Sequence, residues 1–411
     1  MEASLKTEAA RNSAQPVARR VFLWSLGLVG PVAATAPNGL AVLFIVMGLA
    51  VIAGDPSARR LSGIPKVVAL PMVGLLAWGY VTMLWAPDPA LAAFTLTRLV
   101  LAVYAGLAIV SHALALDSAE IEQAERFFLA GYAAGLAILC AEIASQMVFG
   151  NGSSLFVQFI GPRAAIESFL NRSKTILSIL LPLAISVGWR RHGPAAAAAI
   201  AAACLAVFVV GESLASAMGL VVAAGGAVAA VGLGSRLGVR LSAIGIVAMF
   251  MAAPFVARLP VLAELAQRHD ITVSVYHRAA IWGFVAERIA ERPFIGWGME
   301  ASRNIPNAHN TLREFTELLP LHPHNAPLQY WLELGAVGAI LAAAIAAALA
   351  LRTGGSLARR VAVMPTFLTA VFVACISYGL WQGWWYSSLW IIGTLATIVG
   401  RGAERSTGTP G

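Results

Sequence analysis

The stretch LHPHNAPLQYWLELGAVGAIL at 321–341 carries the clearest signal for chemistry in this sequence. His324 and Asn325 are followed by nine residues, then Gly335, two further residues and Gly338. A histidine, with an ordinary pKa of roughly 6.5, can act as a base or a hydrogen-bond partner at neutral pH. The pattern predicts His324 at the N-terminus of an apolar helix, with Gly335 and Gly338 allowing close contact with another helix. Taken alone, His324 is also compatible with an interfacial position without chemistry.

Cationic side chains are the second signal. The stretch 258–325 holds seven arginines and five of the seven histidines: Arg258, Arg268, Arg278, Arg288, Arg292, Arg303, Arg313, His269, His277, His309, His322 and His324. Arg163, Arg172 and Lys174 lie in a second polar segment. Guanidinium is permanently charged and binds phosphate oxygens through two donors, so the set favours a doubly charged anion such as a diphosphate. Any single member is equally typical of a lipid headgroup contact.

Three ionisable residues lie inside apolar runs, namely Arg98, Glu142 and Glu333. Such residues within a membrane span are expected either to serve a functional site or to form ion pairs that fix helix packing.

Composition identifies the elements that must position these side chains. Of 411 residues, 59% are hydrophobic and only 12% charged, and the mean hydropathy is +0.78. A soluble domain carries roughly twice that charged fraction, so the chain is predicted to be an all-α integral membrane protein. The net charge of +8 is divided among segments between apolar runs, which excludes a nucleic-acid-binding face. The cysteines are far apart without metal-ligand spacing, so neither disulfides nor a metal site is expected.

Windows of about 20 apolar residues predict about twelve transmembrane helices. They lie near 21–35, 38–54, 67–85, 91–112, 127–149, 169–189, 194–210, 215–233, 240–257, 326–351, 361–381 and 385–400. Positive charges before the first span place the N-terminus in the cytoplasm, and the short outer loops hold no Lys or Arg.

This topology divides the chain into five parts. They are a cytoplasmic tail at 1–20, nine spans within 21–257, a long outer loop at 258–325, three spans within 326–400 and a cytoplasmic tail at 401–411. The long loop is expected to form an amphipathic layer, because Ile281, Phe284, Val285 and Ile289 recur at helical spacing before the turn PFIGWG. The aromatic cluster Trp381, Trp384, Trp385, Tyr386 and Trp390 is predicted to be an interfacial anchoring belt.

The motifs resemble the O-antigen ligase family, within the larger group that includes O-antigen polymerases and protein O-oligosaccharyltransferases. The family pattern of His, Asn, nine residues, Gly, two residues and Gly is matched at 324–338. In SVYHRAAIWGFVAERIAERPFIGWGMEAS, an Arg, an aromatic residue four positions later and a Pro-x-x-Gly-x-Gly turn fall at Arg278, Trp282, Pro293, Gly296 and Gly298. FLNRSK places Arg172 where the family keeps an outer-face Arg.

The resemblance implies a GT-C-like glycosyltransferase of the bacterial inner membrane, with a periplasmic site. It would transfer O-antigen from undecaprenyl diphosphate to a sugar hydroxyl of lipid A-core, with inversion and without a metal or other cofactor. His324 would act on the acceptor hydroxyl and Asn325 would orient the site. Arg278 and Arg172 would bind the diphosphate, helped by Arg163 and Arg98.

Three alternatives stay open: an O-antigen or exopolysaccharide polymerase, a protein O-oligosaccharyltransferase, and, from another class, a lipid or polysaccharide transporter. A transporter would place its polar residues near the membrane midplane and would usually show internal repeats. In this sequence the polar residues lie at the outer face.

Overall fold

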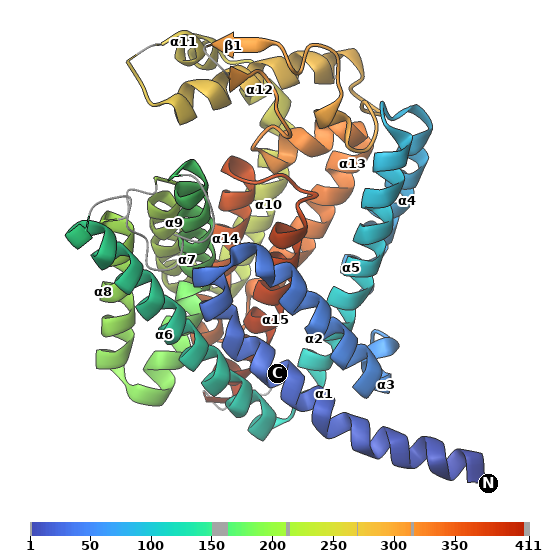
Figure 1. Cartoon of the computed structure of the whole chain (residues 1–411), viewed down its shortest axis with the longest axis vertical. Coiled ribbons are helices and arrows are strands. Elements are labelled where there is room, and N and C mark those ends of the chain that lie inside the picture. The colour runs from blue at the N-terminus through green and yellow to red at the C-terminus, as the bar shows by residue number, and fades with distance from the viewer. Residues whose placement is uncertain (1, 150–162, 211–213, 269, 314–315, 407–411) are drawn as a thin grey trace.

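A computed structural model describes residues 2–149, 163–210, 214–268, 270–313 and 316–406 of the chain (Figure 1). Its α-helices are α1 (Glu2–Thr35), α2 (Leu40–Gly54), α3 (Pro56–Arg59), α4 (Lys66–Thr82), α5 (Pro89–Ala115), α6 (Ser118–Phe149), α7 (Arg163–His192), α8 (Pro194–Val210), α9 (Leu214–Gly232), α10 (Gly234–Val256), α11 (Pro260–Gln267), α12 (Val273–Glu291), α13 (Ala326–Ala350), α14 (Leu357–Ile376) and α15 (Gly383–Ser406). Four 3₁₀ turns are η1 (Pro37–Gly39), η2 (Met83–Trp85), η3 (Ala301–Arg303) and η4 (Leu351–Thr353). Two short strands, β1 (Thr311–Arg313) and β2 (Thr316–Glu317), pair antiparallel.

The predicted fold class is confirmed: the chain is an almost entirely helical membrane protein. Nine helices within the described residues are long and apolar enough to cross a membrane. Each of the twelve predicted ranges overlaps a helix, although the range 361–381 extends beyond the end of α14 at Ile376. Helices α8 and α9 are shorter apolar helices, and α15 is not among the nine. A count of twelve spans therefore stays a prediction. The N-terminal segment predicted as a tail is helical, since α1 begins at Glu2.

Burial ranks the helices by their place in the bundle. In the apolar part of Phe169–His192 in α7, 72% of the stretch is buried, whereas the corresponding share in Lys66–Trp85, which includes α4, is only 17%. Helix α7 is thus central, and α4 is peripheral, with most of its surface available to lipid. Because α7 carries Arg172, that residue projects from the most enclosed helix.

The long loop forms a layer across one end of the bundle, where α11, α12 and β1 lie together (Figure 1). The helical spacing predicted for this loop is confirmed by α12, whose Ile281, Val285 and Ile289 are almost completely buried. Helix α12 ends at Glu291, directly before the turn that begins at Pro293. This layer meets the membrane helices at the start of α13.

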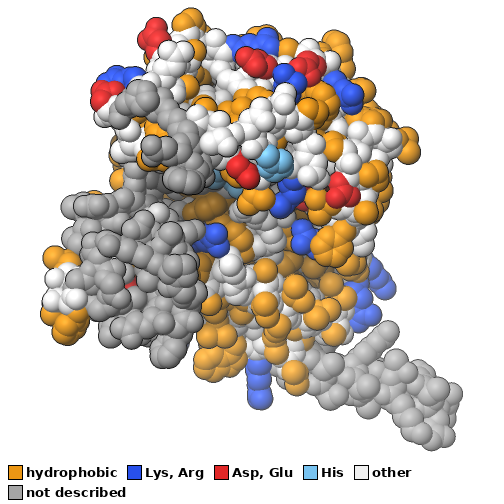
Figure 2. All heavy atoms as spheres, turned by 45° about the horizontal axis from the view of Figure 1, so that its top comes forward, with side chains coloured by type: hydrophobic (Ala, Val, Ile, Leu, Met, Phe, Trp, Pro, Cys, Tyr) orange, Lys and Arg blue, Asp and Glu red, His pale blue; other side chains and the backbone are white. Residues whose placement is uncertain are grey.

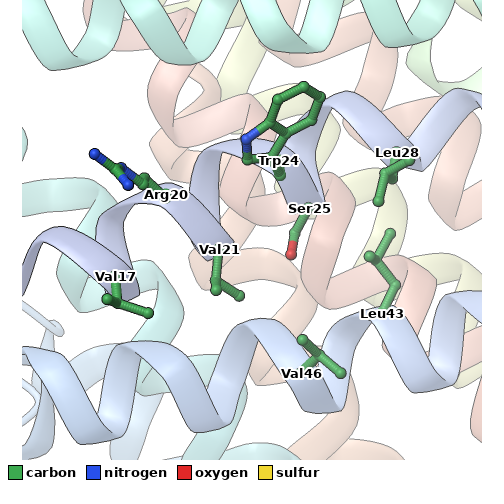
Figure 3. A pocket seen from close by; sticks show the side chains of 8 residues that line it. All are labelled: Val17, Arg20, Val21, Trp24, Ser25, Leu28, Leu43 and Val46. Atoms are coloured by element: carbon green, nitrogen blue, oxygen red, sulfur yellow. The ribbon is translucent and has the colours of Figure 1, made fainter. Parts of the chain in front are cut away.

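A groove of about 400 Å³ between α1 and α2 lies apart from this layer (Figure 3). Seven of its eight lining residues, all but Ser25, are apolar or basic, and Trp24 and Val46 are exposed. The groove offers only Arg20 as a charged group, and Figure 3 shows this side chain turned away from the other lining residues. This largely apolar lining does not suit a diphosphate.

Candidate functional site

Arg278 and Trp282 lie one turn apart on α12 and reach two different segments. The indole Nε1 of Trp282 donates to the carbonyl of Pro323, at 2.9 Å, and so fixes the backbone directly before His324. Arg278 donates from Nε to the carbonyl of Ile376, at 3.0 Å, and from Nη1 to the carbonyl and hydroxyl of Ser274. The motif spacing of Arg and aromatic residue therefore places Trp282 against the segment before α13 and Arg278 against the C-terminus of α14.

His324 lies two residues before α13 in a left-handed backbone conformation, with φ of 53°. Its ring Nδ1 is 2.6 Å from the carbonyl oxygen of Ser377. Because a carbonyl only accepts, Nδ1 carries the proton and Nε2 keeps its lone pair. No hydrogen-bond partner of Nε2 is found among the described residues. His324 is therefore held in the tautomer that a general base requires.

The C-terminus of α14 orients both of these side chains. Ile376 is its last residue and Ser377 its C-cap, and their carbonyls accept from Arg278 and His324 respectively. The final carbonyls of a helix have no partner within the helix and are available to outside donors. Two successive carbonyls thus set the relative position of a cation and a base that are distant in sequence.

Burial keeps His324 neutral. It lowers the pKa of His324 to about 4; the hydrogen bond to Ser377 raises that pKa, and the nearby charges of Arg278 and His277 lower it. Burial also lowers the pKa of Arg278, although a guanidinium stays protonated at neutral pH. The site therefore combines a neutral imidazole with a permanent cation.

Arg172 approaches the same region from α7. Its Nη1 donates to Oδ1 of Asn38, at 2.9 Å, and its guanidinium lies 5.3 Å from the ring centre of Trp384. Tyr378 lies beside this part of α7, because its hydroxyl is 3.2 Å from Oγ1 of Thr175 and its ring packs edge-on against Trp384. Burial raises the pKa of Tyr378, and the charges of Arg172 and Arg278 act in the opposite direction.

Arg98 and Arg163 are the two remaining arginines predicted to bind the donor. Arg98 on α5 donates from Nη2 to the carbonyl of Trp381, at 3.5 Å, and lies 4.8 Å from the Phe94 ring centre. Its Nε is buried and has no hydrogen-bond partner in the part of the chain that the structure describes. Arg98 thus contacts the α14–α15 connection at a different point from Arg278. Arg163 is the first residue of α7, but its side chain lies outside the described residues.

Asn325 is the N-cap of α13. Its Oδ1 accepts from the backbone N–H of Leu328, at 3.0 Å, and Pro327 occupies the first turn. This arrangement starts the helix directly after His324, as the sequence predicted. The amide oxygen of Asn325 is therefore occupied by the backbone.

The expected helix contact at Gly335 and Gly338 needs correction. Gly335 has φ of 64° and ψ of −165°, so it interrupts α13 and is not part of a regular helical face. A Cβ on Gly335 would lie 2.3 Å from the carbonyl oxygen of Phe294, and one on Gly296 would lie 2.5 Å from that of Glu333. A Cβ on Gly338 would meet the Leu334 side chain. The close approach is thus to the PFIGWG turn.

This turn supplies the hydrogen bonds that the break removes. The backbone N–H groups of Trp297 and Gly298 donate to the carbonyls of Leu332 and Glu333, both at 2.8 Å. The N–H of Ala336 donates to the carbonyl of Pro293, also at 2.8 Å. At Gly298, with φ of 99°, a Cβ would clash with Ala86. The two sequence motifs therefore form one structural unit.

Glu333 joins this unit to the α14–α15 connection. Its carboxylate is completely buried and accepts four hydrogen bonds, which is the full capacity of the ionised form. The donors are the backbone N–H of Glu300, the Ser302 hydroxyl, the Gln329 amide and the Trp381 indole, at 2.5–3.0 Å. This network explains why an acidic residue lies inside an apolar helix.

Sequence reasoning missed the segment 377–382. The predicted anchoring belt is wrong for Trp381, Trp384 and Trp385, which are buried at 9%, 7% and 0% exposure. Trp381 supplies the carbonyl that accepts from Arg98, whereas Trp384 and Trp385 pack against Tyr378 in the connection. The signal that could have revealed this is the density of aromatic residues around SYGLWQG, which exceeds what one interface needs.

Figure 2 views the loop end of the molecule. Acidic and basic side chains gather over the loop layer, and a histidine is visible at its lower edge above a mainly hydrophobic surface. No cluster of three or more His, Cys, Asp or Glu side chains able to hold a metal occurs in the part of the chain that the structure describes. The charged side chains visible on this face are thus of both signs.

Residues 169–343 match the family described as O-antigen ligase. Similar proteins include candidate polysaccharide ligases of Rickettsia felis, at 30% identity over 243 residues, Rickettsia conorii, at 30% over 168, and Rickettsia bellii, at 33% over 133. These matches cover 56%, 39% and 31% of this chain and 58%, 41% and 33% of the relatives. The chain thus matches less than two thirds of each relative's length. The family match includes Arg172, Arg278, Trp282 and the residues from His324 to Gly338.

Proposed function

We propose that this chain, whose residues 169–343 match the O-antigen ligase family, transfers a polysaccharide from a lipid diphosphate to a membrane acceptor. The donor is O-antigen linked to undecaprenyl diphosphate, and the acceptor is a sugar hydroxyl of lipid A-core. The observation that carries the proposal is the pairing of a neutral His324 with Arg278 on the successive carbonyls of Ser377 and Ile376.

His324 is proposed as the general base. Its Nε2 takes the proton of the acceptor hydroxyl while the hydroxyl oxygen attacks the anomeric carbon of the donor sugar. Such proton transfer contributes roughly 10²- to 10⁴-fold to a rate. The proton on Nε2 then passes to water, which restores the neutral imidazole. The Ser377 carbonyl keeps Nδ1 protonated throughout, so Nε2 is the nitrogen presented to substrate.

Arg278 and Arg172 are proposed to bind the departing diphosphate. The bond between the anomeric carbon and the phosphate oxygen breaks, and negative charge develops on the leaving group. Fixed cations stabilise this charge without reorganising. Direct displacement inverts the anomeric centre, and the proposed reaction uses no metal. Arg98 and Arg163 assist in donor binding, whereas Asn325 keeps His324 at the helix start.

The proposal places the enzyme in the bacterial inner membrane. The loop 258–325 faces the periplasm, the spans occupy 21–257 and 326–400, and the segments 1–20 and 401–411 are cytoplasmic. Arg190 and Arg191 support this orientation, because the connection between α7 and α8 lies at the end of the bundle opposite to α12 (Figure 1).

A reconstituted assay tests the acceptor. Purified protein receives undecaprenyl-diphosphate-linked glycan with or without lipid A-core, and the products are sized. The proposal predicts glycan on lipid A-core only. Lengthening of the lipid-linked glycan without lipid A-core would instead identify a polymerase, and no product in either reaction would contradict both functions.

A further inference from the structure

His322 lies two residues before His324 and is 7% exposed. Both ring nitrogens have partners: Nδ1 accepts from the backbone N–H of His324, at 3.2 Å, and Nε2 lies 3.1 Å from the Gln382 amide. The two imidazole ring centres are 4.2 Å apart. The ring also lies close to Gly379, where a Cβ would be 2.7 Å from its Cδ2.

These contacts define the protonation of His322. An N–H group donates to Nδ1, so Nδ1 is unprotonated and Nε2 carries the hydrogen of the neutral ring. The partner of Nε2–H is then the amide oxygen of Gln382, the atom left without another partner. Burial lowers the pKa of His322 to about 3, with the charges of His324, Arg303 and Arg278 acting in the same direction. The neutral ring is therefore the form that joins the His324 backbone to Gln382.

The backbone that His322 contacts is strained. His324 has φ of 53°, a region that residues other than glycine rarely adopt and that the surrounding contacts must maintain. Trp282 holds the preceding carbonyl and His322 holds the N–H of His324 itself. Without an acceptor at Nδ1, this N–H would lose its only hydrogen bond among the described residues.

We propose that His322 is a positioning residue that holds the backbone of His324 through Nδ1 and thereby directs His324 Nε2 toward the acceptor hydroxyl. The proposal rests on the function assigned above to His324. Through its contact with Gln382, His322 also links the loop before α13 to the connection before α15.

Three substitutions separate this role from packing. In His322→Asn, the side-chain oxygen lies near the original Nδ1 and can accept from the His324 N–H. In His322→Gln, the amide nitrogen reaches the original Nε2 and can donate to Gln382, but no acceptor remains at Nδ1. His322→Ala removes both contacts. His309→Ala is the matched control, because His309 is an exposed histidine of the same loop.

The variants are compared in the reconstituted transfer assay at equal amounts of monodisperse folded protein. His322→Ala and His322→Gln should lower kcat by about 10- to 100-fold while the donor KM changes by less than about threefold. His322→Asn should keep kcat within about fivefold of wild type, and His309→Ala should match wild type.

A higher kcat in His322→Gln than in His322→Asn would overturn the inference. Glutamine is closer to histidine in volume, so a role in packing alone would favour glutamine over asparagine. Wild-type kcat in His322→Ala, or a change in donor KM alone, would also overturn it. His324→Ala is measured in the same series. Wild-type activity in His324→Ala would contradict the proposed role of His324 itself. Loss of activity in His324→Ala together with wild-type activity in His322→Ala would contradict only the positioning role of His322.

Discussion

At the scale of single residues, the candidate site depends on backbone carbonyls as much as on charged side chains. Arg278 and His324 are 98 and 53 residues from the carbonyls that orient them. Such contacts fix rotamer and tautomer, so the lone pair of His324 Nε2 is presented in one direction. Substitution of either side chain would leave a helix-terminal carbonyl to find another donor.

The low pKa of His324 predicts an unusual pH dependence. A general base works only when unprotonated, so kcat/KM should fall on acidification near the pKa of about 4, and not near the ordinary value of 6.5. Burial disfavours the imidazolium ion, and the nearby charges of Arg278 and His277 act in the same direction, so the decline moves to lower pH. Initial transfer rates measured between pH 4 and 8 check this. A decline centred at or above pH 6.5 would contradict the buried, neutral imidazole.

Metal removal should leave transfer unchanged. The proposed stabilisation of the diphosphate comes from guanidinium groups, which need no cation to bind phosphate oxygens. Activity is measured after treatment with EDTA and again after adding Mg²⁺ or Mn²⁺. A loss of activity that either metal restores would contradict the arginine-based account.

The sequence could identify His324, Arg278 and Trp282, because their types and spacing carry information locally. It could not identify His322, Tyr378 or Glu333 in their observed roles. Each of these acts through a backbone atom or through a partner far away in the sequence, and neither leaves a pattern in one sequence.

At the scale of elements, the break in α13 is the feature that joins the loop layer to the membrane bundle. Gly335 lies within an apolar run that sequence periodicity predicts as one continuous helix. The helix begins and ends near the predicted positions, but the interruption depends on the PFIGWG turn, which inserts its N–H groups at that point. A glycine in the sequence is compatible both with close contact to another helix and with an inserted turn, so the sequence did not show which of the two occurs at Gly335.

Gly335→Ala should strongly destabilise the protein and reduce transfer. The φ of 64° and ψ of −165° are accessible essentially to glycine only, and maintaining them with alanine costs about 1–3 kcal/mol before the clash with Phe294 is counted. Gly245→Ala in α10 is the control, because its Cβ would meet nothing within 4 Å. Thermal unfolding in detergent should show a lower Tm for Gly335→Ala only. Equal Tm values for the two variants would contradict the proposed contact between the PFIGWG turn and the break in α13 at Gly335.

At the scale of the whole molecule, composition and hydropathy predicted the all-α membrane fold and the helix ranges. Length was less informative for α8 and α9, whose apolar segments are shorter than the nine candidate spans. The long loop was predicted as a layer, but its contacts were not. Burial of the aromatic cluster was also missed, since interfacial anchoring and packing beneath a loop require the same residue types.

The proposed orientation predicts opposite labelling of two introduced cysteines. Asn307→Cys lies in the long loop, and His192→Cys lies at the exposed last residue of α7. A membrane-impermeant maleimide added to intact spheroplasts should label the first and should label the second only after permeabilisation. The parent protein is the control, because Cys204 and Cys375 are buried and Cys140 lies within α6. The inverse pattern would contradict a periplasmic loop.

The most direct test of the central claim is single-turnover transfer with donor and lipid A-core by four variants. His324→Ala and Arg278→Ala are compared with His309→Ala and with Arg268→Ala, an exposed loop arginine. The account predicts that both site variants lose at least about 100-fold in rate, while both controls stay near wild type. Wild-type rates in folded His324→Ala or Arg278→Ala protein would contradict the assignment of that residue to the site.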